Sequence, residues 1–312
     1  DLAYELALEK WLDDDQYKPA PALAALRKSA RTFQATHPQV DYPDNLAANL
    51  EALRVLLGLS EAELQVLGFC VLMHCDPTLS DATDQLGMLG FKRAMKVLSV
   101  LLGLPLPTVE TCLAHNSPLM RTGLLEISTS HRAAMALSSM LSVSNQDLPG
   151  LLRFSRGTPL ELFAYAFRLS QPGTLNAEHY SHVRQPLTIA ERYLSKVLAQ
   201  PRPGVNILLY GPPGTGKTQL SRLLAKTLGC ALYEVACTDS LGDPVSAKQR
   251  LCSLRAANSV LHAQRALLVL DEIEDIFQAA SAETGKRSQK GWINRMLEEN
   301  TLPCFWLSNS IE

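Results

Sequence analysis

Four residues in the segment GPPGTGKT have the types and spacing of a phosphate-binding loop. Gly211, Gly216, Lys217 and Thr218 fit the pattern G-x-x-x-x-G-K-[ST], in which glycines let the backbone turn its N–H groups toward an anion. The lysine can reach the β- and γ-phosphates, and the threonine hydroxyl can ligate Mg²⁺. The pattern therefore predicts a site for a nucleoside triphosphate with its magnesium ion.

The neighbouring elements have the order that such a loop needs. It follows the apolar run VNILLY and precedes the helical segment KTQLSRLLAKTLG, whose positive dipole end would point at the phosphates. The predicted nucleotide-binding residues are Gly211, Pro212, Pro213, Gly214, Thr215, Gly216, Lys217, Thr218 and Gln219.

A second group of candidate residues follows the apolar run ALLVL. Asp271 and Glu272 would lie at the C-terminal end of a buried strand, where α/β sheets place their ligands. We expect Asp271 to hold the magnesium through water, with Thr218 as the other metal-binding residue. Glu272 would act as the general base on the attacking water. Glu274 and Asp275 continue the acidic run, and we interpret them as solvated residues at the start of a helix.

A third candidate ends the apolar run CFWLS. The polar side chain of Asn309 would lie beside the γ-phosphate and could orient the attacking water. The predicted catalytic residues are therefore Lys217, Glu272 and Asn309.

These residues need a sheet to position them, and the second half of the sequence predicts one. From Val205 on, the apolar runs VNILLY, ALYEVA, ALLVLD and CFWLSN alternate with helical stretches, which is typical of parallel strands in an α/β sheet. Pro172 and Gly173 indicate a linker before it. We assign residues 176–312 to the nucleotide-binding domain, in a chain of 312 residues that is long enough for two domains.

Residues 1–175 are expected to form a mainly α-helical N-terminal region. Ser60 and Glu63 have the spacing of a capping box at the start of one helix. Residues 91–128 have the order helix, turn, helix, strand, which resembles a winged helix-turn-helix. The second helix of that unit contains Glu110 but no Arg or Lys, so we favour a protein-contact or structural role over DNA binding.

The composition of the chain argues against nucleic acids and membranes as its main partners. The net charge of -2 argues against a strong nucleic-acid or membrane surface, and no apolar run approaches the ~18 residues of a membrane span. The sequence has seven cysteines without paired spacing and no visible signal peptide, so we expect a cytoplasmic protein with reduced thiols. Only 19% of residues are charged, which favours buried subunit or domain contacts.

The motifs resemble those of the AAA+ ATPase superfamily. GPPGTGKT is similar to its Walker A motif, LLVLDE to its Walker B motif with the catalytic glutamate, and Asn309 to its sensor 1 residue. The resemblance covers about the last third of the chain. It implies an α/β P-loop NTPase core with a five-stranded parallel sheet, ATP and Mg²⁺ as cofactors, and ATP hydrolysis. It also implies a homo-oligomeric ring, often a hexamer, with ATP at subunit interfaces.

The resemblance further implies an arginine finger from a neighbouring subunit and a helical lid with sensor 2. Both would follow Glu312, and the sequence opens on Asp1, so we expect a fragment truncated before the lid. Because an arginine finger contributes about 10³–10⁵ in rate in related phosphoryl transfers, such a fragment is expected to bind ATP but hydrolyse it slowly.

Three functions remain open at this point. The leading one is an ATP-driven machine that remodels a protein partner bound through the N-terminal region. Protein-threading members carry an aromatic residue where this sequence has Ser240, and a serine grips a polypeptide poorly. A nucleotide-dependent scaffold or switch with little turnover is therefore the alternative. A DNA-dependent ATPase that uses Lys92, Arg93 and Lys96 is less favoured, because these cations lie on the first helix of the winged-helix-like unit.

Overall fold

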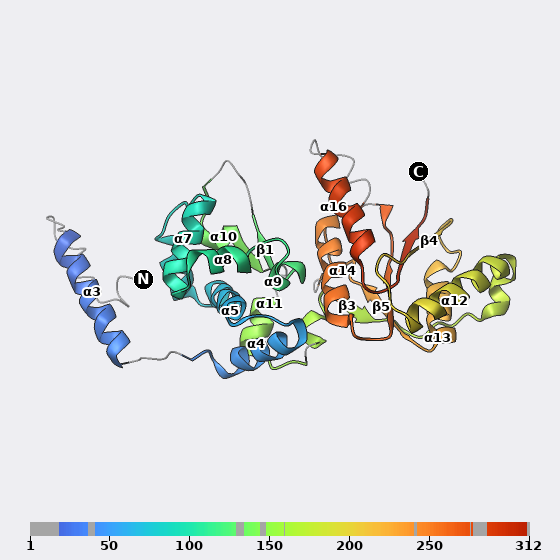
Figure 1. Ribbon diagram of the computed structural model, residues 1–312, viewed down its shortest axis with the longest axis horizontal. Coiled ribbons are helices and arrows are strands. Elements are labelled where there is room, and N and C mark those ends of the chain that lie inside the picture. The colour runs from blue at the N-terminus through green and yellow to red at the C-terminus, as the bar shows by residue number, and fades with distance from the viewer. Residues whose placement is uncertain are drawn as a thin grey trace.

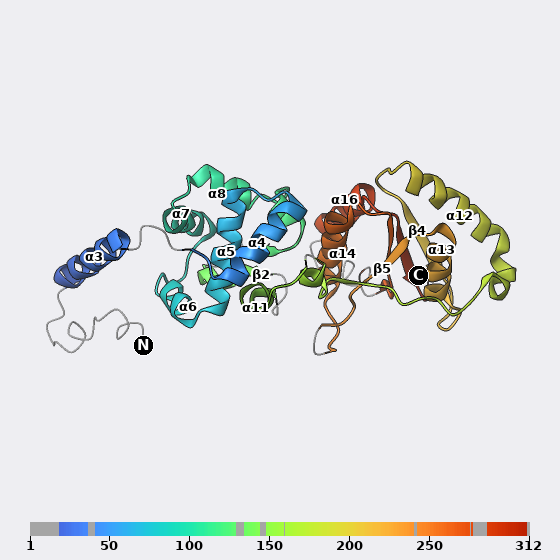
Figure 2. The ribbon, with the colours of Figure 1, turned by 90° about the horizontal axis from the view of Figure 1, so that it is seen from below.

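The computed structural model shows a group of helices followed by an α/β sheet (Figure 1). It describes residues 19–36, 41–128, 134–143, 148–158, 160–239, 242–274, 276 and 286–310. Helices α14 (Ala247–Leu261) and α16 (Lys286–Glu299) lie on the side of the sheet that faces the N-terminal helices, and this arrangement is the same in both views (Figures 1 and 2).

The N-terminal part is mainly helical, as the sequence predicts. Its helix α5 packs against α4, α6, α8 and α11 at the centre of this part. The helices are α3 (Pro19–Thr36), α4 (Asp44–Leu57), α5 (Glu61–Cys75), α6 (Pro77–Asp84), α7 (Phe91–Leu102), α8 (Leu106–Cys112), α9 (Pro118–Arg121), α10 (Leu137–Met140) and α11 (Leu148–Phe154).

The start of α5 is fixed by the capping box that its sequence predicts. The Ser60 hydroxyl accepts the Glu63 N–H at 3.3 Å, and Oε2 of Glu63 accepts the Ser60 N–H at 2.9 Å. The other carboxylate oxygen of Glu63 accepts the N–H of Leu119, in α9, at 3.1 Å. Because only 5% of Glu63 is exposed, one buried carboxylate satisfies backbone donors of two helices.

The segment that resembles a winged helix contains two helices and a strand in the expected order. The chain bends by 109° between helices α7 and α8, and β1 (Leu125–Ile127) pairs antiparallel with β2 (Leu141–Val143). Its assignment as a winged helix-turn-helix stays a prediction. Within the described residues, no single helix has the length and apolar composition of a membrane span, although α7 and α8 taken together do.

The sheet of the C-terminal part has five strands in the order β3-β5-β6-β7-β4. The four apolar runs of the sequence form its parallel strands, as predicted. The strands are β3 (Phe167–Leu169), β4 (Asn206–Tyr210), β5 (Ala231–Val235), β6 (Ala266–Leu270) and β7 (Cys304–Ser308).

The expectation of a fully parallel five-stranded sheet is wrong for β3. This strand pairs antiparallel with β5, with Phe167 opposite Val235 and Leu169 opposite Tyr233. Strand β3 pairs with backbone N–H and C=O groups of β5 that would otherwise be exposed at the edge of the sheet. A three-residue strand is too short to carry a periodic pattern, so the sequence gives no signal for it. The domain boundary before residue 176 stays a prediction. Strand β3 belongs to the sheet although its residues precede this boundary in the sequence.

The two faces of the sheet belong to different apolar cores. Helices α12 (Arg184–Ala199) and α13 (Lys217–Leu228) pack on one face through Leu194, Leu224 and Leu228. The core on the other face is continuous from the N-terminal helices through α14 to the sheet. Two 3₁₀ helices, η1 (Glu161–Phe163) and η2 (Ala177–Val183), flank β3.

Helix α14 joins the helical part to the sheet. It packs against α4 and α9 on one side and against β3, β5 and β6 on the other. At its first turn, Lys248 forms an ion pair of 2.6 Å with Glu126 of β1. The N-terminal part therefore rests on a helix that also supports the sheet.

Replacement of Glu63 by alanine is expected to lower the free energy of unfolding by about 2 kcal/mol, because it leaves buried N–H groups without acceptors. Urea unfolding measures this change. Glu61→Ala is the matched control, since Glu61 lies on the same helical turn but is exposed. Equal stabilities of the two variants would contradict the role given to Glu63.

Candidate nucleotide-binding site

The predicted site residues follow the ends of three neighbouring parallel strands. Gly211 comes directly after β4, Asp271 after β6 and Asn309 after β7. Strand β7 pairs with both of the others, and Tyr210 lies opposite Ser308 in the register of β4 and β7. Because the carboxyl ends of parallel strands meet at one edge of the sheet, the three loops share that edge.

The glycine-rich loop has the backbone conformation that its composition predicts. Gly214 (φ 79°) and Gly216 (φ 82°) lie in the left-handed region, which glycine adopts without the steric penalty of a Cβ. Gly216 is the N-cap of α13, and the Thr215 hydroxyl donates to the carbonyl of Pro212 at 2.9 Å. The loop therefore leads directly into the N-terminus of a helix, where backbone N–H groups and the helix dipole favour an anion.

Lys217 joins the loop to the end of β7. Its ammonium group donates to the carbonyls of Gly211 (2.8 Å) and Pro212 (3.1 Å) and to Oδ1 of Asn309 (2.9 Å). Two of the predicted catalytic residues are thus in direct contact, although 92 positions separate them in the sequence.

Thr218 and Asp271 also meet. The Thr218 hydroxyl donates to Oδ2 of Asp271 at 2.8 Å, and Oδ1 accepts the N–H of Glu272 at 2.9 Å. A hydroxyl and a carboxylate on adjacent loops are the hard oxygen donors that Mg²⁺ prefers. The residues present therefore fit a magnesium ion held, with water, between the loop and the end of β6.

Glu272 has an unusual backbone conformation. Among the described residues it is the one non-glycine residue with positive φ, at 50°, and its side chain is exposed. Such a conformation costs energy and persists only when surrounding contacts hold it. Those contacts come from Arg250 of α14, whose guanidinium donates to the Glu272 carbonyl at 2.8 Å and to the Asp271 carbonyl.

Arg250 is 2% exposed, so a charged side chain is buried under the end of β6. A buried arginine is tolerated where its donors are well satisfied, and here backbone carbonyls accept from it. Arg250 cannot be identified from the sequence, since an arginine inside a helix carries no signal for this contact.

Glu274 is not the solvated residue that the sequence suggested. Its Oε1 accepts the Ser308 hydroxyl at 3.0 Å and the backbone N–H of Asn309. Burial raises the pKa of Glu274, but these hydrogen bonds outweigh burial, and the pKa lies below its ordinary value. The carboxylate therefore fixes the backbone that carries Asn309.

The segment before α12 closes the other side of the loop. The hydroxyl of the buried Tyr180 donates to the Gly216 carbonyl at 2.8 Å, and a Cβ on Gly216 would lie 2.9 Å from that hydroxyl. Oε1 of Gln219 accepts the N–H of Thr174 at 2.9 Å. Gly216 thus needs to be glycine for two reasons, its positive φ and this close approach.

The structure brings four of the predicted residues together in two hydrogen-bonded pairs, Lys217 with Asn309 and Thr218 with Asp271, and Glu272 follows Asp271 in the chain. The exposed residues of the glycine-rich loop are Pro212, Pro213, Gly214 and Thr215. Ser240 and Asp275, two residues to which the sequence drew attention, lie outside the described residues. The roles assigned to the site residues remain predictions.

Comparison with known proteins gives a family for this region. Residues 207–303 match the family model for "ATPase family associated with various cellular activities (AAA)". This stretch begins in β4 and ends just before β7, so it includes the glycine-rich loop and both acidic residues after β6.

Curated relatives are similar to part of the chain. The 26S proteasome regulatory subunit 8 homolog B of Arabidopsis thaliana is 30% identical over 132 residues, which cover 42% of this chain and 30% of the relative. The ATPase family gene 2 protein homolog B of Homo sapiens is 33% identical over 120 residues, which cover 38% and 15%. The outer mitochondrial transmembrane helix translocase of Xenopus tropicalis is 28% identical over 96 residues, which cover 31% and 26%.

The chain thus spans less than a third of the length of each of these relatives. The matched residues, the mostly parallel sheet and the loop at its carboxyl edge agree with one another. Residues 207–303 of this chain thus form a domain of the AAA ATPase family.

Proposed function

We propose that this protein binds Mg-ATP at the carboxyl edge of its sheet and hydrolyses the γ-phosphate. The observation that carries the proposal is the contact of Lys217 with Asn309 and of Thr218 with Asp271. Phosphate-binding, metal-binding and water-orienting groups must lie within a few ångströms of one another for this reaction, and these contacts support such a site.

Each residue of the site has a distinct part in the proposed reaction. The loop N–H groups and Lys217 bind the phosphates, and Asn309 orients the attacking water. Glu272 accepts the proton of that water as it attacks the γ-phosphorus, and the bond to the β-phosphate oxygen breaks to give ADP and phosphate. Thr218 and Asp271 hold the magnesium ion, which neutralises charge on the phosphates when bound.

We further propose that hydrolysis in a homo-oligomer remodels a protein partner bound through the N-terminal part. The name of one relative, a transmembrane helix translocase, supports a protein cargo. The continuous core between the N-terminal helices and α14 supports mechanical coupling. A scaffold that follows ATP occupancy without turnover is the second candidate, favoured by the absence of an aromatic residue at Ser240.

Lys217→Ala is expected to abolish nucleotide binding, because it removes the cation that contacts the phosphates. Glu272→Gln is expected to retain ATP with turnover reduced at least about 100-fold, since the amide cannot accept the proton. Binding of a fluorescent ATP analogue and release of phosphate measure the two effects. Normal hydrolysis by Glu272→Gln would show that Glu272 is not the base.

Arg250→Gln is expected to lower kcat about 10- to 100-fold with little change in KM, because the backbone of Glu272 loses its support. Steady-state ATPase assays separate the two constants. Lys248→Gln is the control, since Lys248 lies on the same helix but is exposed. A fall in thermal stability with unchanged kcat would mean that Arg250 is purely structural.

Turnover per chain is expected to rise with protein concentration, if neighbouring subunits complete each active site. Phosphate release measured across a dilution series, with Glu272→Gln as the blank, tests this. Bound ATP with negligible turnover at every concentration would favour the scaffold.

A further inference from the structure

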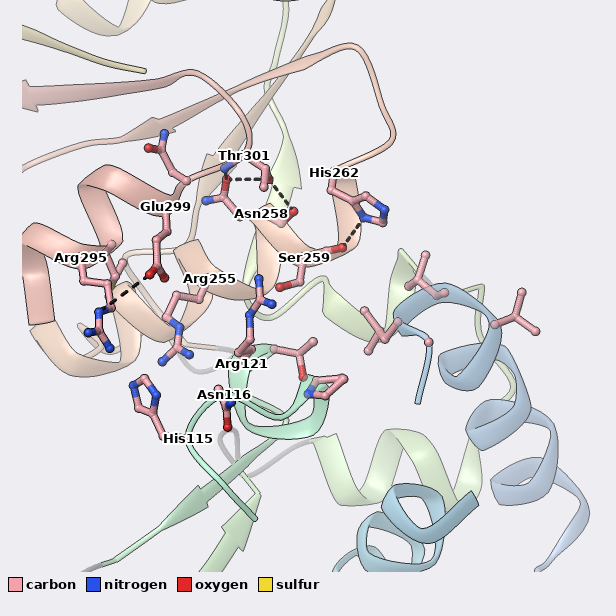
Figure 3. Close-up of a pocket in the computed structure, with 18 residues that line it drawn as sticks. His115, Asn116, Arg121, Arg255, Asn258, Ser259, His262, Arg295, Glu299 and Thr301 are labelled. Atoms are coloured by element: carbon pink, nitrogen blue, oxygen red, sulfur yellow. Dashed lines mark hydrogen bonds and ion pairs between the residues drawn. The ribbon is translucent and has the colours of Figure 1, made fainter. Parts of the chain in front are cut away.

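A cavity of about 910 Å³ lies between the N-terminal helices and the sheet domain, away from the nucleotide site. Its walls come from the C-terminal end of α4, from α9 and the turn before it, and from α14 and α16 (Figure 3). Its volume is within the range of sites for small organic ligands.

The lining of this cavity includes three arginines and two histidines. Arg121, Arg255 and Arg295 line it, together with His115. Figure 3 shows these four side chains on the same side of the cavity. Among the described residues, Glu299 is the one carboxylate of the lining, and it pairs with Arg295 at 3.8 Å. The lining is therefore cationic in a chain whose net charge is -2.

Two of these arginines have side chains that are not paired within the described residues. Neither the Arg121 nor the Arg255 guanidinium forms a hydrogen bond or an ion pair there. Burial lowers the pKa of Arg255, and the positive charge of Arg121 lowers it further; Cys252 and Glu299 act in the opposite direction. The half-buried Arg255 and the exposed Arg121 repel each other, and an anion bound between their guanidinium groups would stabilise both charges.

We propose that this cavity binds a small phosphate-bearing molecule, with Arg121 and Arg255 as the phosphate ligands. Guanidinium groups donate pairs of parallel hydrogen bonds that match phosphate oxygens. The lining also includes the apolar residues Val55 and Leu57 of α4 and Met296 of α16, against which the body of an organic phosphate can pack. The half-enclosed cavity fits a small molecule rather than a polymer backbone.

Binding there would hold the two parts of the chain together. Arg121 ends α9, while Arg255 lies on α14, the helix that also carries Arg250 under the catalytic strand end. A ligand that bridges them would stabilise the contact between the N-terminal part and the sheet domain, so the site is suited to regulation. The proposal does not depend on ATP hydrolysis.

The test uses Lys217→Ala as the background, so that the glycine-rich loop does not contribute phosphate binding. Inorganic phosphate and AMP are the two probes, measured by equilibrium dialysis at constant ionic strength. One saturable site per chain is expected. Tighter binding of AMP would identify an organic phosphate as the ligand, and equal binding would identify the free anion.

Arg121→Gln and Arg255→Gln, each added to this background, are expected to weaken binding of the probe about tenfold or more. Arg93→Gln, an exposed arginine of α7 outside the cavity, is the matched control and should leave the affinity unchanged. Arg121 is exposed, so its variant is expected to fold, and circular dichroism verifies this. No saturable binding, equal affinities in all variants, or binding of a DNA duplex in place of the small probes would overturn the proposal.

Discussion

The parallel pairing of β7 with both β4 and β6 is the constraint on which the site depends. It places the ends of three strands side by side, so that Gly211, Asp271 and Asn309 begin neighbouring loops. Hydrogen bonds then connect these loops: Lys217 donates to Asn309, and Thr218 to Asp271. A shift in the register of β7 would separate these groups even if every side chain were unchanged.

Helix α14 extends this constraint to the rest of the chain. Its buried Arg250 holds the carbonyls of Asp271 and Glu272, and so supports a backbone conformation that a glutamate rarely adopts. The same helix packs against α4 and α9 and lines the basic cavity with Arg255. A displacement of the N-terminal part would thus act on the helix that positions the proposed base, which gives a physical route from the proposed partner binding to the proposed hydrolysis.

The features that could be predicted from the sequence are those that depend on residues close together in the chain. The glycine-rich loop, the four parallel strands and the capping box of Ser60 and Glu63 each depend on residues close together in the chain, and the structure confirms them. The missed features depend on contacts between distant residues. Arg250 and Tyr180 support the site through backbone carbonyls, and Glu274 binds the N–H of Asn309, which lies 35 positions away. No spacing rule predicts such contacts, and the three residues of β3 are too few for a periodic pattern.

The central claim is that the glycine-rich loop and the acidic end of β6 form one metal-nucleotide site. Electron paramagnetic resonance with Mn²⁺ in place of Mg²⁺ tests it directly, because free and bound Mn²⁺ give different signals. We expect one Mn²⁺ to bind per chain when a non-hydrolysable ATP analogue is present, and Asp271→Asn to weaken this binding at least about tenfold. Absence of nucleotide-dependent Mn²⁺ binding, or equal binding by Asp271→Asn, would contradict the account.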